Sequence, residues 1–253
     1  MRNKLTLICI LLTLTWFAFG ENLDGQRYYG DRLHFEFSSF QVDVSGYEEF
    51  AHLTGAYDFK LEYDNRIPYL TIYWPDPVKY VALFNDLVLY LWEADKEEIA
   101  YVGASRSSSF IDLYGFGKSD LIFSASSFYQ RSNESYPPEN LGLFQLFYPW
   151  VEGSTGTGIG DYLIIEDAYY SVMVSNGFVS YCKPELYLQN GRVRELQIEN
   201  LESNEVTIFE LQDSPHPQEI ILPGGEQDSS FKITIISVYE GSLYSDICIN
   251  FID

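Results

Sequence analysis

Apolar and polar residues alternate along many short segments of this chain, and turn-forming residues separate the segments. The alternation is strict at residues 33–37 (Leu-His-Phe-Glu-Phe) and 59–63 (Phe-Lys-Leu-Glu-Tyr). A period of two residues is typical of a β-strand with one buried face. Helical turns are expected only in a short stretch around residues 46–53. The pattern therefore predicts an all-β protein.

The first half of the chain is predicted to be a run of antiparallel hairpins. Polar pairs such as Asp64-Asn65 and Asn85-Asp86 supply tight turns between apolar runs. A lipocalin-like barrel is one interpretation of this pattern, and a small hairpin domain that packs beside the second half is the other. Besides the two segments above, the predicted strands are residues 68–74, 79–84, 87–92 and 98–102.

The second half shows longer strand patterns, which predict a two-sheet sandwich or jelly roll. Prolines and glycines such as Pro223 and Gly224-Gly225 mark the connections. The loop-like residues 115–119 are the expected boundary between a first domain (21–118), of unknown role, and a second (119–253). The strands expected in the second domain are residues 162–165, 170–174, 193–199, 206–211, 219–222, 232–238 and 247–252.

The first twenty residues have the pattern of a secretory signal peptide. Arg2 and Lys4 precede an uncharged run over residues 5–19, and Ala18 and Gly20 are small residues at the positions that a signal peptidase reads. The apolar run is shorter than the ~20 residues that a membrane span needs. We therefore expect residues 1–20 to be cleaved and the protein to be exported to a bacterial periplasm, the cell surface or the medium. A retained anchor is the alternative.

The charge balance excludes two classes of partner. The chain has 15 Lys and Arg against 37 Asp and Glu, a formal charge of -22. Nucleic acids and anionic membrane surfaces both attract basic proteins, so neither is an expected partner. The expected second domain is the more acidic half, with 5 basic and 20 acidic residues.

The sequence carries no familiar catalytic or metal motif. It contains no His-x-His, His-Glu-x-x-His, Cys-x-x-Cys or Gly-x-Ser-x-Gly, and the glycines of residues 153–160 fit no nucleotide-binding fingerprint. Paired carboxylates for glycoside hydrolysis remain open, because 37 acidic residues offer many pairs. Cys182 and Cys248 follow the signal segment, and oxidising conditions outside the cytosol permit a disulfide between them. Two buried thiols are the alternative.

Several ordered motifs over the last 130 residues resemble one known family. The chain here resembles the NADase-type glycan-binding domain, a discoidin-like module related to the F5/8 type C, galactose-binding-like jelly rolls. The resemblance implies a jelly-roll sandwich and carbohydrate recognition, and it does not imply NAD hydrolysis. The motifs are Ser126-Ser127-Phe128-Tyr129, Tyr136-Pro137-Pro138-Glu139-Asn140-Leu141, Trp150-Val151-Glu152-Gly153, Gly158-Ile159-Gly160-Asp161, Asn176-Gly177-Phe178, Asn190-Gly191-Arg192-Val193-Arg194, Leu211-Gln212-Asp213, Val238-Tyr239-Glu240-Gly241-Ser242 and Tyr244-Ser245-Asp246-Ile247-Cys248-Ile249.

The chain departs from the family pattern where a cation would bind. Family members follow the Asn-Leu pair with Phe-Asp-Gly-Asp, whereas Asn140-Leu141 is followed here by Gly-Leu-Phe-Gln. An aspartate that could bind calcium is therefore missing. Asp213 is open to two interpretations, a cation ligand or a cap for the turn before Ser214-Pro215. We expect no cofactor, with calcium as the one alternative.

The resemblance also suggests where a ligand would bind. In a jelly roll the strand faces pack together, so end loops must supply a site. Glu152 could accept sugar hydroxyls or the N–H groups of the glycine-rich loop, and Trp150 could be an aromatic platform or part of the core. The expected function is non-catalytic binding of glycans, neutral ones over anionic ones because of the acidic charge. The alternatives are a hydrolase acting on glycosides or NAD, and an envelope structural protein. The predicted glycan-binding residues are Trp150, Glu152, Asn176, Tyr239, Tyr244 and Asp246.

Overall fold

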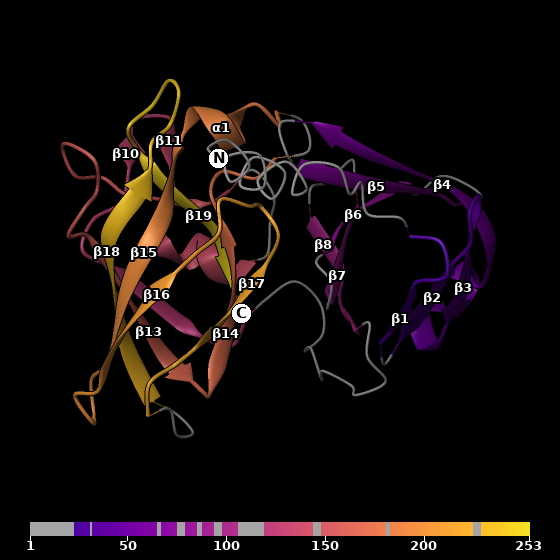
Figure 1. Ribbon diagram of the computed structural model, residues 1–253, viewed down its shortest axis with the longest axis horizontal. Coiled ribbons are helices and arrows are strands. Elements are labelled where there is room, and N and C mark those ends of the chain that lie inside the picture. The colour runs from indigo at the N-terminus through magenta and orange to yellow at the C-terminus, as the bar shows by residue number, and fades with distance from the viewer. Residues whose placement is uncertain are drawn as a thin grey trace, which may run out of the picture.

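The fold is all-β, as the alternation of residues predicts, and its strands form two large sheets and one small hairpin (Figure 1). A computed structural model describes residues 23–30, 32–64, 67–74, 79–84, 88–93, 98–105, 119–143, 148–180, 183–224 and 229–253. The expected signal segment, the turn residues 115–118 and Cys182 lie outside these ranges. Within them, no helix has the length and apolar character that crossing a membrane requires.

The first sheet is a closed barrel of eight antiparallel strands that pair in sequence order. It closes where β1 pairs with β8, with Tyr29 opposite Ser105. The hairpins therefore take the barrel-like arrangement. The strands are β1 (Arg27–Tyr29), β2 (Leu33–Phe37), β3 (Gln41–Gly46), β4 (Gly55–Asp64), β5 (Ile67–Tyr73), β6 (Lys79–Phe84), β7 (Val88–Glu93) and β8 (Glu98–Ser105), and the 3-10 helix η1 (Glu48–Leu53) follows β3.

Alternating residues fill the barrel. In β2, Leu33, Phe35 and Phe37 are buried while the residues between them are more exposed. Closure leaves no unpaired sheet edge around the barrel, which removes the usual site of strand addition. The residues buried in this core include Tyr28, Val42, Val44, Phe50, Leu53, Tyr57, Leu70, Ile72, Trp74, Tyr80 and Leu91.

The second sheet has nine strands and folds into a sandwich. Along its path the order is β17-β14-β19-β15-β18-β13-β9, while β12 pairs with β19 and β16 pairs with β15. A short hairpin of β10 and β11 stands apart. The elements are β9 (Ile122–Ala125), β10 (Gln130–Arg131), β11 (Glu134–Ser135), the 3-10 helix η2 (Pro138–Leu143), β12 (Trp150–Val151), β13 (Tyr162–Ala168), β14 (Ser171–Asn176), α1 (Leu186–Gln189), β15 (Gly191–Asn200), β16 (Val206–Glu210), β17 (Gln218–Ile221), β18 (Ser229–Tyr239) and β19 (Ile247–Ile252).

Strand β15 joins the two layers of the sandwich. Its first residues pair in parallel with the start of β19, Gly191 opposite Ile247, and the rest of β15 pairs with β18 and β16. The core between the layers is mostly aliphatic. Its buried members include Trp150, Leu163, Ile165, Val172, Val174, Val193, Leu196, Ile198, Phe231, Ile233, Ile235, Ile249 and Ile252.

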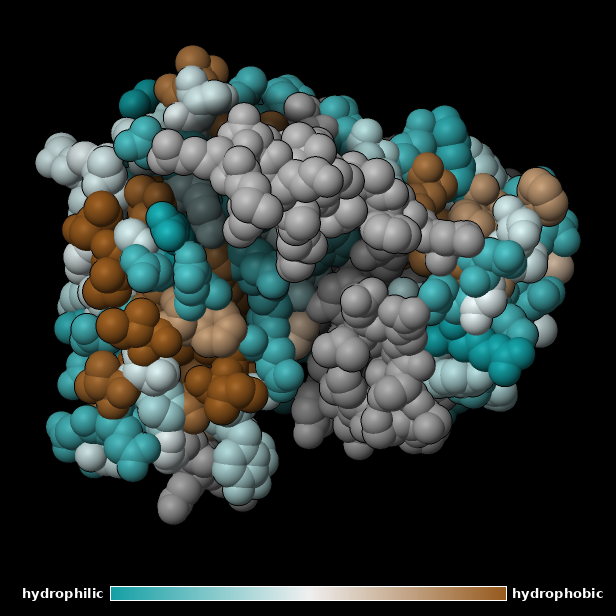
Figure 2. Space-filling view, viewed as in Figure 1, coloured by the Kyte–Doolittle hydropathy of each residue, from teal (hydrophilic) through white to brown (hydrophobic). Residues whose placement is uncertain are grey.

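Some apolar side chains of the sandwich face outward. Alternation along β16 sends Phe209 toward the core and leaves Val206 and Ile208 exposed. Figure 2 shows apolar side chains gathered over the part of the sandwich that carries β15, β16 and β18. This surface lies on a strand face, away from the loops described below.

Candidate functional site

Loops at one end of the sandwich surround a pocket of about 380 Å³. This volume falls within the range of sites for small molecules. The walls come from the β10–β11 hairpin, the end of β12, the segments on either side of α1 and the loop before β19. The lining residues are Tyr129, Arg131, Glu134, Tyr136, Val151, Phe178, Lys183, Leu186, Asn190, Tyr244 and Asp246.

Aromatic rings form the base of the pocket. The ring of Tyr136 lies 6.1 Å from that of Tyr129 and 5.9 Å from that of Phe178, measured between centroids. Behind them, Val151 and Cys248 are buried in the same cluster. Burial raises the pKa of Tyr136, so its hydroxyl stays protonated and can donate a hydrogen bond.

The charged side chains of the pocket balance one another. Arg131 and Lys183 are cationic, Glu134 and Asp246 are anionic, and the guanidinium of Arg131 lies 5.0 Å from the Tyr129 ring centroid. The whole second half carries 20 acidic against 5 basic residues. The pocket is therefore a locally neutral site in an acidic module.

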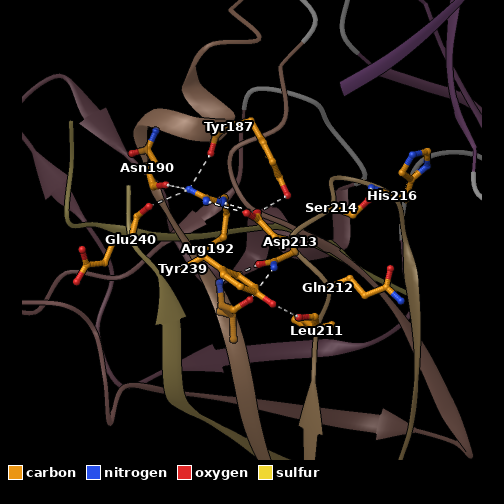
Figure 3. A network of polar contacts seen from close by, with 12 residues as sticks. Tyr187, Asn190, Arg192, Leu211, Gln212, Asp213, Ser214, His216, Tyr239 and Glu240 are labelled. Atoms are coloured by element: carbon orange, nitrogen blue, oxygen red, sulfur yellow. Dashed lines mark hydrogen bonds and ion pairs between the residues drawn. The ribbon is translucent and has the colours of Figure 1, made fainter. Parts of the chain in front are cut away.

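A buried network holds one wall of the pocket in place (Figure 3). Arg192 donates to both carboxylate oxygens of Asp213, from Nε at 2.9 Å and from Nη2 at 3.2 Å. Its Nη1 donates to the carbonyls of Asn190 at 2.8 Å and Glu240 at 3.4 Å. The hydroxyl of Tyr187 also donates to Asp213, at 3.2 Å. Asn190 follows α1 and lines the pocket, and Glu240 follows β18. The network therefore fixes the positions of α1 and of the end of β18 relative to the pocket.

Asp213 is therefore the ion-pair partner of Arg192. Tyr239 lies beside this network and not in the pocket. Its hydroxyl donates to the carbonyl of Leu211 at 3.0 Å, and the guanidinium of Arg194 lies 5.9 Å from its ring centroid. Tyr239 thus supports the wall from behind.

The carboxyl group of Glu152 is fully buried. Oε2 accepts the N–H of Ser154 at 2.7 Å, while Oε1 has no hydrogen-bond partner among the described residues. Burial is the main cause that raises the pKa of Glu152 to about 7; the Ser154 N–H opposes the rise, and the negative charges of Asp161 and Asp246 add to it. The loop-bonding interpretation of Glu152 fits this geometry, and direct contact with a sugar does not.

Two of the six predicted glycan-binding residues line the pocket, Tyr244 and Asp246. Trp150 and Asn176 are fully buried, as Glu152 is, so none of the three has surface to offer a ligand. The Trp150 indole N–H donates to the carbonyl of Ser127 at 3.1 Å, which makes Trp150 part of the core and not a platform. The Asn176 amide exchanges two hydrogen bonds with the backbone of Val193. The polar atoms of Trp150, Glu152 and Asn176 thus bond buried backbone groups and not a ligand.

The pocket contains residues that the local sequence pattern did not single out. Tyr129 and Tyr136 stood in motifs of the family resemblance, but their rings meet only because the β10–β11 hairpin folds back between them. The spacing of two tyrosines around Arg131 and Glu134 was an available signal for such a hairpin. The other pocket residues that were not predicted as binding residues are Val151, Phe178, Lys183, Leu186 and Asn190.

Cys248 carries a buried thiol that has no disulfide partner among the described residues, and burial raises its pKa well above the ordinary value. Since Cys182 lies outside the described residues, the pairing of the two cysteines stays a prediction. Among the described residues, no group of three or more His, Cys, Asp or Glu side chains is placed to hold a metal ion. The expected absence of a cofactor likewise stays a prediction.

The architecture and the loop-end pocket define a discoidin-like module in the second half of the chain. A family model, the NAD glycohydrolase translocation F5/8 type C domain, matches residues 115–253. The chain belongs to this family, which confirms the resemblance drawn from the motifs. The family is a binding or translocation domain rather than a catalytic one.

Solved structures with partial similarity include discoidin-like modules. The family 32 carbohydrate-binding module of NanJ from C. perfringens, in complex with galactose, shares 14% identity, with a TM-score of 0.38, over 52% of this chain and 90% of that one. An F5/8 type C domain from Bacteroides fragilis shares 11% identity, with a TM-score of 0.35, over 52% and 92%. The mycobacterial arabinofuranosyltransferase AftD shares 15% identity, with a TM-score of 0.36, over 58% of this chain and 12% of that one. A search of curated proteins finds no match.

The free energy of unfolding is expected to fall as the pH rises from about 4.5 to about 7, and then to level off. Burial raises the pKa of Glu152 from 4.5 to about 7 and that of Asp253 to about 6, so the folded state binds these protons more tightly than the unfolded state. In the Glu152→Gln variant the free energy of unfolding should decline less over this pH range, by about 1–3 kcal/mol, because this side chain no longer titrates. Urea denaturation at a series of pH values measures this. Glu139→Gln, at an exposed acid, is the control and should keep the decline.

Proposed function

We propose that this protein is an exported, non-catalytic glycan-binding protein that uses the loop-end pocket. The observation that carries the proposal is the pocket's combination of an aromatic base with a ring of hydrogen-bonding side chains. Aromatic faces cover the C–H groups of a sugar ring, while carboxylates, amides and cations bond its hydroxyls. The family membership and the galactose complex of the carbohydrate-binding module support the same reading.

The ligand proposed for this pocket is an uncharged glycan. The two cations and two carboxylates of the lining cancel, so a neutral ligand meets a neutral site. An anionic glycan must approach against the charge of the acidic module. Affinity is expected to be modest, because each hydrogen bond contributes only about 0.5–1.5 kcal/mol and an open site buries little surface.

Loss of pocket side chains is expected to weaken glycan binding by about tenfold. A glycan array identifies the best neutral ligand, and calorimetric titration then compares it with a matched sialylated or sulfated form. Tyr129→Leu removes one ring of the aromatic base, and Asp246→Asn removes a charged acceptor. Tyr170→Ala serves as the control, because Tyr170 is exposed in the turn between β13 and β14 at the opposite end. Pocket variants that bind like the unaltered protein, or a preference for the anionic form, would contradict the proposal.

A hydrolase is the second candidate, because Glu134 and Asp246 share the pocket and paired carboxylates can cleave glycosides. We expect no turnover of NAD or of aryl glycosides, since the family is a translocation domain rather than a catalytic one. The measurement is product formation by the purified full chain beside Glu134→Gln and Asp246→Asn. Turnover that either variant abolishes would establish the enzyme instead.

Export and domain organisation belong to the same proposal. Cleavage after Gly20 would release a chain whose first domain (21–118) holds the barrel and whose second (119–253) holds the pocket. The pocket would then meet glycans outside the cytosol. If no glycan binds in the array, an envelope structural role becomes the better interpretation.

A further inference from the structure

The buried carboxyl of Glu152 lies behind the pocket, and glycan binding as proposed does not use it. Its backbone N–H donates to the carbonyl of Ile247 at 3.1 Å, at the start of β19. The charged and titratable groups that act on it are Asp161 before β13 and Asp246 before β19, and the thiol of Cys248 interacts with it in turn. Glu152 therefore stands between a glycine-rich loop (residues 153–160) and the segment that carries Asp246 into the pocket.

Gly158 closes this loop over the carboxyl group. Its φ is +64°, and a Cβ placed there would lie 2.8 Å from Cγ of Glu152 and 3.0 Å from Cγ1 of Ile247. Gly156 also has a positive φ, but a Cβ there would meet nothing within 4 Å. Residues 153–157 are exposed. The ends of the loop are anchored, because the N–H of Gly153 donates to Oγ of Ser127 at 3.0 Å and the N–H of Gly160 donates to the carbonyl of Ile235 at 2.9 Å. Between these ends Gly158 is the buried residue, and it packs against Glu152 and Ile247.

The two protonation states of Glu152 favour different loop positions. When Glu152 is neutral, the closed loop costs little, because a neutral carboxyl tolerates burial. When it is ionised, Oε2 keeps the N–H of Ser154, but Oε1 has no donor among the described residues, and the charges of Asp161 and Asp246 repel the carboxylate. Water can reach the carboxylate only if the loop moves away. Ionisation therefore favours an open loop and disturbs the segment of Asp246.

We propose that Glu152 is a proton switch that couples the glycine-rich loop to the pocket through Asp246. Protonation closes the loop and holds the pocket in its binding form, and ionisation opens the loop and weakens binding. Burial raises the pKa of Glu152 to about 7, so the switch operates near neutral pH. The ligand part of this inference rests on the proposed function, but the loop motion does not.

NMR spectroscopy of the full chain tests the switch without any ligand. The probes are the side-chain carboxyl carbon of Glu152 and the amides of Ser154, Gly158 and Asp246, followed from about pH 5 to about pH 9. The expected result is one common midpoint near pH 7, which Glu152→Gln abolishes at all three amides. A midpoint near the ordinary value of 4.5, or an Asp246 amide that does not follow the carboxyl, would overturn the proposal.

A second variant keeps the test decisive if Glu152→Gln fails to fold. Gly158→Ala retains the carboxyl group but pushes the loop away from it, so hydration should lower the midpoint by about one unit. Gly156→Ala is the matched control, because it shares the positive φ and lacks the contact. An unchanged midpoint in Gly158→Ala, or an equal shift in both variants, would contradict the role of the loop.

The pH dependence of binding then tests the regulation. The neutral glycan chosen from the array should bind the unaltered protein about threefold more weakly at pH 8 than at pH 6, and Glu152→Gln should bind it equally at both. Equal affinity in the unaltered protein would overturn the regulation even if the loop titrates. If no glycan binds at either pH, the proposed function fails, while the NMR midpoint still decides whether the switch exists.

Discussion

Replacing Arg192 with methionine is expected to destabilise the sandwich by about 3 kcal/mol. Only 6% of the Arg192 side chain is exposed, and its loss leaves the Asp213 carboxylate without its bidentate partner. The carbonyls of Asn190 and Glu240 lose a donor as well. Asp213 is 21% exposed and can recruit some water, which keeps the loss at the lower end for a broken buried pair.

The midpoint of urea denaturation measures this effect. Arg194→Met is the matched control, because Arg194 pairs with Glu210 at 3.2 Å on the surface, where both side chains are more than half exposed. Such a pair contributes less than about 1 kcal/mol. Arg192→Met combined with Asp213→Leu should recover most of the loss, since no buried charge remains. Equal effects of Arg192→Met and Arg194→Met would show that the network in Figure 3 is not structural.

The pattern of apolar and polar residues located many of the strands, but it gave the full bounds of only a few. The predicted segments 33–37, 79–84 and 247–252 coincide with β2, β6 and β19; β2 alternates because one face is buried, whereas β19 is buried on both faces. The predicted segment 59–63 covers half of β4, and β3 was not predicted. The two-residue strands β10, β11 and β12 were not predicted, since so short a segment shows no period. Closure of the barrel depends on the pairing of β1 with β8, which no local pattern encodes.

The site was predicted less completely than the fold. Tyr244 and Asp246 could be predicted as pocket residues, because both lie in the loop that precedes β19. Glu152 and Asn176 could not be distinguished from them in the sequence. A polar residue in a loop motif has the same local sequence context whether its side chain faces a ligand or bonds a backbone group. Pocket residues such as Lys183 come from segments far apart in the sequence. Only their three-dimensional arrangement shows that they share one cavity.

Replacing Trp150 with alanine is expected to destabilise the sandwich by about 3–5 kcal/mol. The side chain has no exposed surface and packs in the core, with Trp150 opposite Ile249 in the pairing of β12 with β19. Its removal leaves a cavity and an unpaired carbonyl at Ser127. Trp150→Phe keeps most of the ring and should cost about 1–2 kcal/mol. Thermal and urea denaturation measure both, beside Phe128→Ala, whose side chain is partly exposed, as the control.

Glycan titration of the same variants separates a core role from an aromatic platform. If Trp150 belongs to the core, Trp150→Phe loses stability but binds the glycan with the affinity of the unaltered protein, because the pocket is built on Tyr129 and Tyr136 instead. A Trp150→Phe variant that loses binding at unchanged stability would place the indole against the ligand. The pocket, which already reaches Val151, would then have to open past it to the buried indole when a ligand binds, and the hydrogen bond from the indole N–H to Ser127 opposes such opening.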